Sequence, residues 1–312
     1  MAAPASVVGS WGCQARGEAK SRALAPRGRE RYAAGVFPLP ELALAADRSH
    51  DTEVRPRYED VAQSGGLRVE ATQICMGEAV WRGSLGPHPA MGIMLASGIV
   101  PILRRYVVVA EDTPLSVHEA LSVHGRWGLA SAGDRFLLEM RVDVTGTRGD
   151  SFGRPVERAG ERGGVAQIYG EHVLTRLFAP PGERRVDALP EGLEVTAERR
   201  WVPDEALLEV DGDVEAERIE RTVLFGLTHT DSNQHVNSLV YPRLFEELAL
   251  EAWDDGDLLL RDLHIAWRKP SFAGELVRFA VRRATSGDRR GVVGTVSGED
   301  GRPRCTAQLW LR

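Results

Sequence analysis

The sequence predicts an α+β protein made of two similar halves, in each of which an apolar helix precedes about four antiparallel strands. Three observations support this prediction. Runs rich in β-branched and aromatic residues recur between Gly-rich turns, an apolar helical pattern precedes these runs in each half, and a Pro-rich, acidic stretch separates the halves. The length of 312 residues also suits two domains of roughly 150 residues each.

The N-terminal segment, residues 1–48, differs in composition from the rest of the chain. It is rich in Ala, Arg, Gly and Pro and has few apolar clusters, so we expect it to be disordered. It has no continuous apolar run, which argues against a secretory signal. The basic stretch between Arg16 and Arg31 resembles an organelle transit peptide, and an over-long gene start explains the composition equally well.

The first predicted domain spans residues 49–178. A helix is expected over residues 71–85, ending near Gly83 or Gly86, because the stretch is largely apolar and stops at glycines. The strands that follow are expected at residues 102–109, 136–144 and 165–177.

Residues 179–219 are Pro-rich and acidic with little periodicity, so we expect them to link the two domains. The second predicted domain, residues 220–312, opens with a short strand at 221–225. A helix follows, in which Leu244, Leu248 and Ala252 recur at a spacing of four residues. Later strands are expected at residues 263–268, 276–284, 292–296 and 306–311, with a hairpin turn at 298–301.

The two halves share one order of elements, and this order suggests an internal duplication. Aligning residues 58–70 with residues 225–237 places a strand end, a loop and a helix start opposite one another, with Val69 opposite Val236. A long apolar helix wrapped by a curved antiparallel sheet is the hot-dog arrangement. We therefore predict a tandem (double) hot-dog fold that forms a pseudo-dimer within one chain, and further association of chains into a homo-oligomer stays open.

Composition excludes several classes of function. The net charge of −6 and the pI of about 5.8 argue against nucleic acid as a partner, because such binding needs Lys and Arg to neutralise phosphates. No apolar run reaches the roughly 18 residues of a membrane helix, so no membrane span is expected. The three isolated cysteines favour a reducing compartment, and we expect a cytoplasmic protein. The histidines show no metal-ligand spacing, so neither a metal nor a cofactor is predicted.

The most informative segment lies just before the second apolar helix. Polar residues alternate along it, and in an extended segment this spacing points them to one side. A single such residue is usually a helix cap. A group of four that includes a histidine exceeds what capping needs, and it predicts a functional site. The four residues are Asp231, Asn233, His235 and Asn237.

The pattern D-x-N-x-H-V-N followed by Tyr241 resembles the signature of acyl-ACP thioesterases and of acyl-CoA thioesterases in the 4-hydroxybenzoyl-CoA thioesterase-like hot-dog superfamily. The resemblance implies catalytic roles for Asp231, Asn233 and His235. Substrate-binding roles are expected for Val236, Asn237, Ser238 and Tyr241. The sequence departs from the plant enzymes at one place: where they carry a Glu-Cys pair, residues 267–271 here read Trp-Arg-Lys-Pro-Ser.

These residues suit hydrolysis of an acyl thioester, acyl-CoA or acyl-ACP, in fatty acid metabolism. Asp231 would be the base for a water molecule or attack the carbonyl carbon directly. Asn233 would orient the water or the carboxylate, and His235 would donate to the carbonyl or share the proton transfer. Backbone N–H groups of residues 236–239, at the helix start, would form an oxyanion hole, while Asn237 caps the helix.

The first half lacks this chemistry in the alignment above. Ser64, Gly65 and Gly66 stand opposite residues 231–233, and Arg68 stands opposite His235. We therefore expect one working site per chain. The first domain would then act as a built-in partner. Its candidates for lining the acyl pocket, with packing in the core as the alternative role, are Ile74, Met76 and Trp81.

Two other functions stay open. A hot-dog dehydratase or hydratase acting on 3-hydroxyacyl or enoyl thioesters would use His88, or His235 with Asp231. A protein that binds acyl thioesters without turnover would explain the missing Glu-Cys pair.

Overall fold

The computed structural model describes residues 39–42, 46–111, 113–253 and 260–311, which form one compact unit. The predicted disorder of residues 1–48 therefore falls mostly outside the described residues. Of this segment, Leu39 and Leu42 pack against a small buried cluster that includes Tyr169 and Trp310. Among the described residues, no helix combines the length and the apolar character needed to cross a bilayer.

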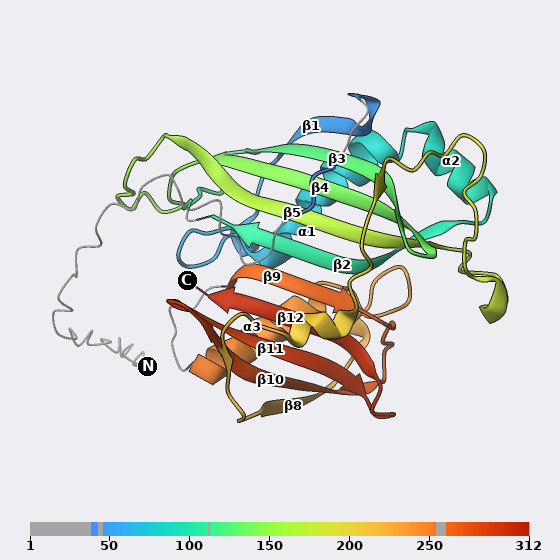
Figure 1. The fold of residues 1–312 in the computed structure, drawn as a ribbon. Coiled ribbons are helices and arrows are strands. Elements are labelled where there is room, and N and C mark those ends of the chain that lie inside the picture. The colour runs from blue at the N-terminus through green and yellow to red at the C-terminus, as the bar shows by residue number, and fades with distance from the viewer. Residues whose placement is uncertain (1–38, 43–45, 112, 254–259, 312) are drawn as a thin grey trace, which may run out of the picture. The chain divides into compact units, whose positions relative to one another are not determined.

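The described strands of both halves belong to one sheet (Figure 1). Its first-half strands are β1 (Ser49–Val54), β2 (Val100–Ala110), β3 (Leu121–Ala132), β4 (Arg135–Thr147) and β5 (Arg162–Thr175). Its second-half strands are β8 (Ile219–Leu224), β9 (Leu260–Trp267), β10 (Leu276–Ser286), β11 (Arg289–Gly298) and β12 (Pro303–Leu311). The short strands β6 (Ala197–Glu198) and β7 (Asp213–Val214) pair with β3 and β10.

The strand order shows the duplication directly. It runs β1-β3-β4-β5-β2 in the first half and β9-β12-β11-β10 in the second, with β8 pairing β10. The central strands β2 and β9 pair antiparallel, with Val107 opposite His264. Outward from the β2–β9 pair, both halves therefore have the same order of corresponding strands, which confirms the predicted tandem hot-dog fold. The domain boundaries at residues 178 and 220 stay predictions.

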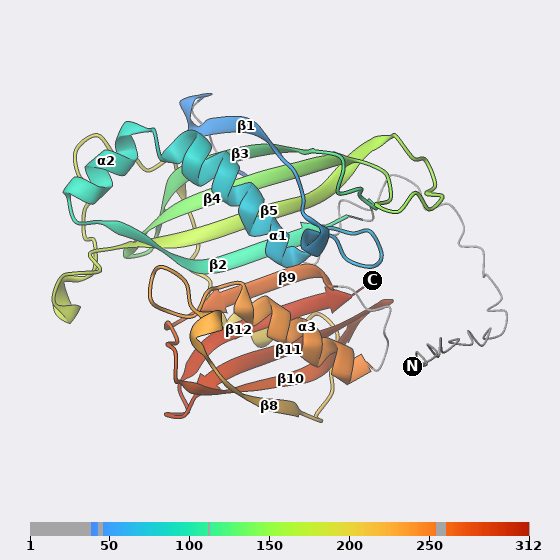
Figure 2. The ribbon, with the colours of Figure 1, turned by 180° about the vertical axis from the view of Figure 1, so that it is seen from behind.

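One long helix in each half lies on the same face of the sheet (Figure 2). In the first half, α1 (Val69–Met76) continues as a π-helical segment, Gly77–Leu85. In the second, α3 spans Val240–Trp253. Both helices were predicted. A further helix, α2 (Pro89–Ala96), was not predicted, and it begins with His88 as its cap.

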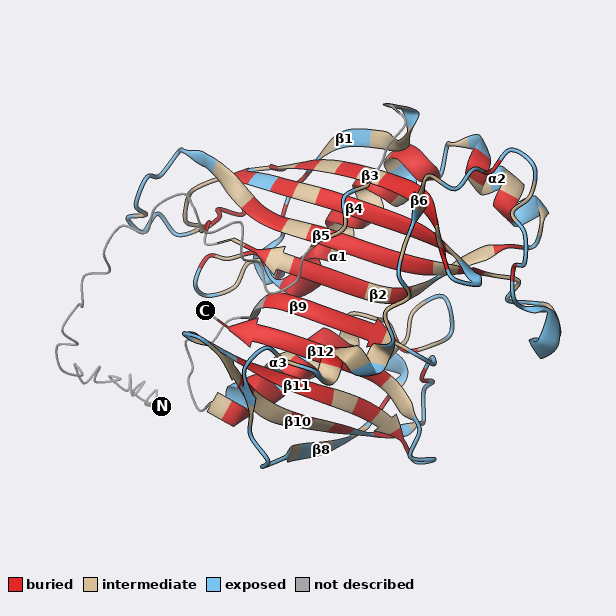
Figure 3. Ribbon diagram, in the orientation of Figure 1, coloured by how far each residue is buried: buried red, intermediate tan, exposed pale blue. Residues whose placement is uncertain are grey.

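The core lies between this face of the sheet and the helices, and Figure 3 shows that the strands and both long helices are rich in buried residues. Alternate residues of β4 and β10 that are at most 2% exposed contribute to the core. In β4 the opposite face is buried as well, at Leu137, Glu139 and Arg141. In α3, Phe245 is fully buried and packs edge-on against Phe279, with ring centroids 5.3 Å apart. The alternating core residues of the two strands are Met140, Val142, Val144, Val277, Phe279 and Val281.

The predicted linker crosses the opposite face of the sheet, where Figure 1 shows it in front of β12. Arg104 of β2 pairs with Glu171 of β5, at 2.5 Å, and with Asp204 of the linker, at 2.8 Å. The Arg104 guanidinium also stacks on the Trp201 ring at 3.7 Å. Buried ion pairs with additional partners hold this stretch of the linker onto the sheet.

Candidate active site

The polar motif lies in a loop that joins β8 to α3, called here the motif loop (residues 226–239). The loop begins with a single 3₁₀ turn, Leu227–His229, closed by a hydrogen bond from the Gly226 N–H to His229 Nδ1 of 2.9 Å. Thr230 and Val236 then pair as an isolated bridge. The residues between them form a tight turn that holds the predicted catalytic side chains.

Asp231 is half-buried, and its carboxylate is oriented by the turn itself. Its Oδ1 accepts a hydrogen bond from the Asn233 N–H at 2.8 Å. Its backbone N–H donates to the His235 carbonyl at 3.2 Å, which closes the turn. Oδ2 has no hydrogen-bond partner among the residues that the structure describes. One carboxylate oxygen therefore stays available to a water molecule or a substrate.

His235 is also half-buried, and Asn233 is exposed at the tip of the turn. His235 Nδ1 lies 3.2 Å from the Val236 carbonyl oxygen. In the neutral ring, the proton on Nδ1 donates to this carbonyl, which leaves Nε2 as the unprotonated nitrogen. The turn thus presents a carboxylate oxygen, an amide side chain and a basic ring nitrogen within five residues.

The prediction that four free backbone N–H groups form an oxyanion hole is wrong for three of them, because these three already donate to acceptors within the protein. The Val236 N–H donates to the Ser271 carbonyl at 2.7 Å, and the Asn237 N–H donates to the His229 carbonyl at 2.8 Å. The Leu239 N–H donates to Asn237 Oδ1 at 2.8 Å, which is the helix cap expected of Asn237. Within the described part of the chain, only the Ser238 N–H of the four lacks an acceptor.

The four predicted substrate-binding residues have different environments. Val236 and Tyr241 are 3% and 2% exposed, so both pack in the core. Burial raises the pKa of the Tyr241 hydroxyl, which stays protonated at neutral pH. Asn237 and Ser238 are half-buried. Ser238 Oγ accepts a hydrogen bond of 3.1 Å from Gln73 Nε2, so this residue joins the motif loop to α1 of the first half.

The segment that replaces the plant Glu-Cys pair lies against the motif loop, since the Ser271 carbonyl accepts the Val236 N–H. Its Arg268 pairs with Glu205 of the linker at 2.6 Å. Cys305, opposite Trp267 in the sheet, is fully buried, and burial raises the pKa of its thiol well above the usual range. It therefore does not supply the missing nucleophile.

The first half has a loop with matching backbone hydrogen bonds, called here the first-half loop (residues 57–68). Val61 and Leu67 form the bridge that Thr230 and Val236 form in the motif loop. The turn-closing hydrogen bonds also match: the Gly65 N–H donates to the Ala62 carbonyl, as the Gln234 N–H does to Asp231. The alignment from sequence was therefore wrong by two residues, because Leu67 and not Val69 corresponds to Val236.

The corrected alignment still leaves the first half without the motif. Ala62, Ser64 and Gly66 correspond to Asp231, Asn233 and His235. The turn is the same because its backbone bonds are the same, but its carboxylate, amide and imidazole are absent.

His88 has both ring nitrogens engaged. Nδ1 accepts the Ala90 N–H at 3.1 Å to cap α2, and Nε2 lies 3.2 Å from Asp47 Oδ2. The ring also packs edge-on against Trp127 at 4.9 Å. This environment suits a structural histidine. It does not support the hypothesis of a dehydratase in which His88 is catalytic.

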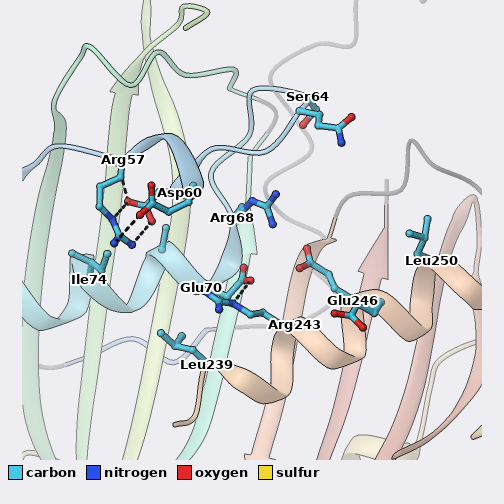
Figure 4. Close-up of a pocket in the computed structure, with 14 residues that line it drawn as sticks. Arg57, Asp60, Ser64, Arg68, Glu70, Ile74, Leu239, Arg243, Glu246 and Leu250 are labelled. Atoms are coloured by element: carbon cyan, nitrogen blue, oxygen red, sulfur yellow. Dashed lines mark hydrogen bonds and ion pairs between the residues drawn. The ribbon is translucent and has the colours of Figure 1, made fainter. Parts of the chain in front are cut away.

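A cavity of about 870 Å³ lies between the first-half loop, α1 and α3, and we call it the first-half groove (Figure 4). Ile74 and Leu239 line it, so one predicted acyl-pocket residue does face a cavity. Met76 is buried and Trp81 is half-buried against His172. None of the three predicted catalytic residues lines this groove. The groove itself was not predicted from the sequence.

Comparison with known proteins supports the fold assignment. In structure the chain is similar to a Lactobacillus plantarum protein assigned as an oleoyl thioesterase, with a TM-score of 0.60, 15% identity, and coverage of 86% of this chain and 97% of the other. It is similar to an acyl-ACP thioesterase from Bacteroides thetaiotaomicron, with a TM-score of 0.57, 14% identity, and 85% and 98% coverage. It is also similar to the 12:0-ACP thioesterase from Umbellularia californica, with a TM-score of 0.53, 15% identity, and 87% and 100% coverage.

No model of a known protein family matches the sequence, and no curated protein matches it either. At identities near 15%, the structural likeness establishes the architecture. The resemblance predicted from the motif is thus confirmed at the level of the fold: the chain has the double hot-dog fold that these acyl thioesterases have.

Proposed function

We propose that the protein hydrolyses acyl thioesters at the motif loop. The observation that carries this proposal is the environment of Asp231. Its carboxylate is held by the Asn233 N–H through one oxygen, while the second oxygen has no partner among the described residues. His235 closes the same turn. The double hot-dog fold and the resemblance of the motif to acyl thioesterases add support.

In the proposed reaction, Asp231 takes a proton from a water molecule while the oxygen of that water bonds to the thioester carbonyl carbon. The carbonyl π electrons move to the carbonyl oxygen, and the proposed donor that stabilises its negative charge is the Ser238 N–H, which has no acceptor among the described residues. When the tetrahedral intermediate collapses, the C–S bond breaks and the thiolate leaves with a proton. The proton that Asp231 took from the water passes through His235 Nε2 to the departing sulfur, and the Asn233 amide orients the water.

The proposed substrates are acyl-CoA and acyl-ACP. Both present the same acyl-S-phosphopantetheine group, and hydrolysis of this bond by a carboxylate base needs no metal or cofactor. The absence of the Glu-Cys pair favours the one-carboxylate scheme over a thiol nucleophile.

The test is an assay of the purified protein with saturated acyl-CoA and acyl-ACP of several chain lengths, in which free thiol is followed. Thiol release that Asp231→Asn removes supports hydrolysis. With 3-hydroxyacyl thioesters, a change in enoyl absorbance without thiol release would instead identify a dehydratase. Binding without either change would identify a protein that holds acyl thioesters without turnover.

A further inference from the structure

The first-half groove lies where the duplication places a second copy of the proposed active site. The motif loop faces α1 of the first half, as the contact between Ser238 and Gln73 shows. The first-half loop faces α3 of the second half in the same way, since residues of both line the groove, and the ion pair between Arg243 of α3 and Glu70 of α1 spans this side. The groove is thus built by the same elements with the two halves exchanged.

The groove does not carry the hydrolytic side chains. Ala62, Ser64 and Gly66 stand in its loop where Asp231, Asn233 and His235 stand in the motif loop. A thioester bound here would meet no carboxylate base from this turn. The groove nevertheless encloses about 870 Å³, which is in the usual range for a small-molecule site.

Glu70 gives the groove an unsatisfied hydrogen-bond acceptor. Its side chain is only 7% exposed, and its Oε1 accepts the Arg243 Nε–H at 3.0 Å. Its Oε2 is buried and has no hydrogen-bond partner in the described part of the chain. Buried polar atoms are almost always paired in folded proteins, so this atom points to a ligand. Because Arg243 already balances the charge, the missing partner is a neutral N–H or O–H donor.

Arg68 gives the groove an unmatched positive charge. The other arginine of the loop, Arg57, is bound by Asp60 at 2.9 Å and by Glu59 at 3.0 Å. Arg68 is exposed, and no ion-pair partner for it exists among the described residues. Figure 4 shows Arg68 and Glu70 on the side of α1 that faces α3. An anionic group is the complement that Arg68 lacks.

The rest of the lining mixes apolar residues, which can hold a hydrocarbon segment, with carboxylates that have partners of their own. Of these carboxylates, Glu59 and Asp60 pair with Arg57, and Glu247 pairs with Arg221. Ile74 of α1 and Leu239 before α3 lie on the two walls of the groove, and Leu250 lies further along α3. A fitting ligand therefore combines an apolar segment, an amide-type donor and an anionic end.

We propose that the first-half groove binds a second acyl-phosphopantetheine thioester and does not hydrolyse it. A pantetheine amide N–H donates to Glu70 Oε2, a phosphate pairs with Arg68, and the acyl chain packs on Ile74 and Leu239. The choice of ligand rests on the proposed function, because phosphopantetheine is the group shared by its substrates.

The experiment measures the binding stoichiometry of S-octyl-CoA, a thioether that cannot be hydrolysed, by isothermal titration calorimetry. The full chain is expected to bind two equivalents. Arg68→Ser and Glu70→Leu should each weaken one of them at least tenfold, and Arg68→Lys should retain it. Arg302→Ser, which removes an exposed arginine from the β11–β12 turn, is the matched control and should keep both.

Two results overturn the proposal: fewer than two equivalents, or two equivalents that Arg68→Ser leaves unchanged. Arg68 is exposed, so its substitution leaves folding intact even if Glu70→Leu does not fold. Thiol release by the unsubstituted protein is measured in parallel and judges the proposed hydrolysis separately. If the protein hydrolyses thioesters but binds one equivalent of S-octyl-CoA, only the second site is overturned. If it binds two equivalents but does not hydrolyse thioesters, only the enzymatic function is overturned.

Discussion

Gly65 and Gln234 occupy the same position in the two halves, and both have a positive φ, 85° and 63°. In each loop the residue donates its N–H three residues back, to Ala62 at 2.8 Å and to Asp231 at 3.0 Å. A glycine adopts this conformation without strain, whereas a residue with a side chain does not. The motif loop therefore keeps a strained backbone at the residue between Asn233 and His235, which is typical of functional turns.

We expect Gln234→Gly to fold with nearly unchanged stability, because relief of the left-handed strain offsets the greater freedom of glycine in the unfolded chain. Gln234→Val should lower the free energy of unfolding by about 1 kcal/mol or more, since a β-branched residue fits this conformation poorly. Urea unfolding of both variants checks the expectation. Ser232→Val, at an exposed position of the same turn without a positive φ, is the control. Equal free energies of unfolding for Gln234→Val and Ser232→Val would contradict the expectation.

For Asp231→Asn we expect thiol release to fall by at least the roughly 10²-fold that a general base supplies. The side-chain oxygen of asparagine still accepts the Asn233 N–H, so the turn and the thermal unfolding temperature should be retained. The neighbouring Ser232→Ala should have nearly normal turnover. An Asp231→Asn protein that folds and keeps normal turnover would remove Asp231 from the mechanism.

Ser64→Ala tests whether one half carries the activity. Ser64 corresponds to Asn233, is exposed, and accepts the Gly66 N–H through Oγ at 3.3 Å. Turnover should stay within a few fold of the unsubstituted protein, because this turn lacks a carboxylate. Measuring kcat and KM of Ser64→Ala beside Asn233→Ala makes the comparison direct. Loss of activity in both variants would mean that both halves take part in catalysis.

The buried His172 should make the free energy of unfolding depend on pH. This histidine is buried, and desolvation lowers its pKa from 6.5 to about 4. Between these values the unfolded chain binds the proton and the folded chain does not, so this contribution is complete above pH 6.5 and is lost as the pH falls toward 4. The shift corresponds to a loss of about 3 kcal/mol.

The measurement compares urea unfolding at pH 7 and at pH 4.5. His172→Gln should lose less stability between the two pH values than the unsubstituted protein does. The exposed His50→Gln should behave like the unsubstituted protein. The same pH dependence in all three proteins would show that His172 does not control it.

Local sequence determined the elements whose side chains follow a simple period. The spacing of Leu244, Leu248 and Ala252 predicted α3, and alternation in β10 predicted its buried face. In β4 the predicted face is buried, but Leu137, Glu139 and Arg141 on the other face are buried too. The motif itself was also visible, because alternating polar residues before an apolar helix are conspicuous in any chain. Period and residue type report which face of an element is buried, and this much is encoded locally.

Only the tertiary structure decided what each face packs against. Strand β3 was missed because its glycines and serines weaken the strand pattern, although sheet neighbours bury its Trp127 completely. The repeat register was misjudged by two residues, since hydrogen bonds and not residue types define it. The first-half groove depends on residues 173 positions apart, Glu70 and Arg243. Such contacts arise when β2 pairs with β9 and brings the two helices together, and no local pattern in the sequence specifies that pairing.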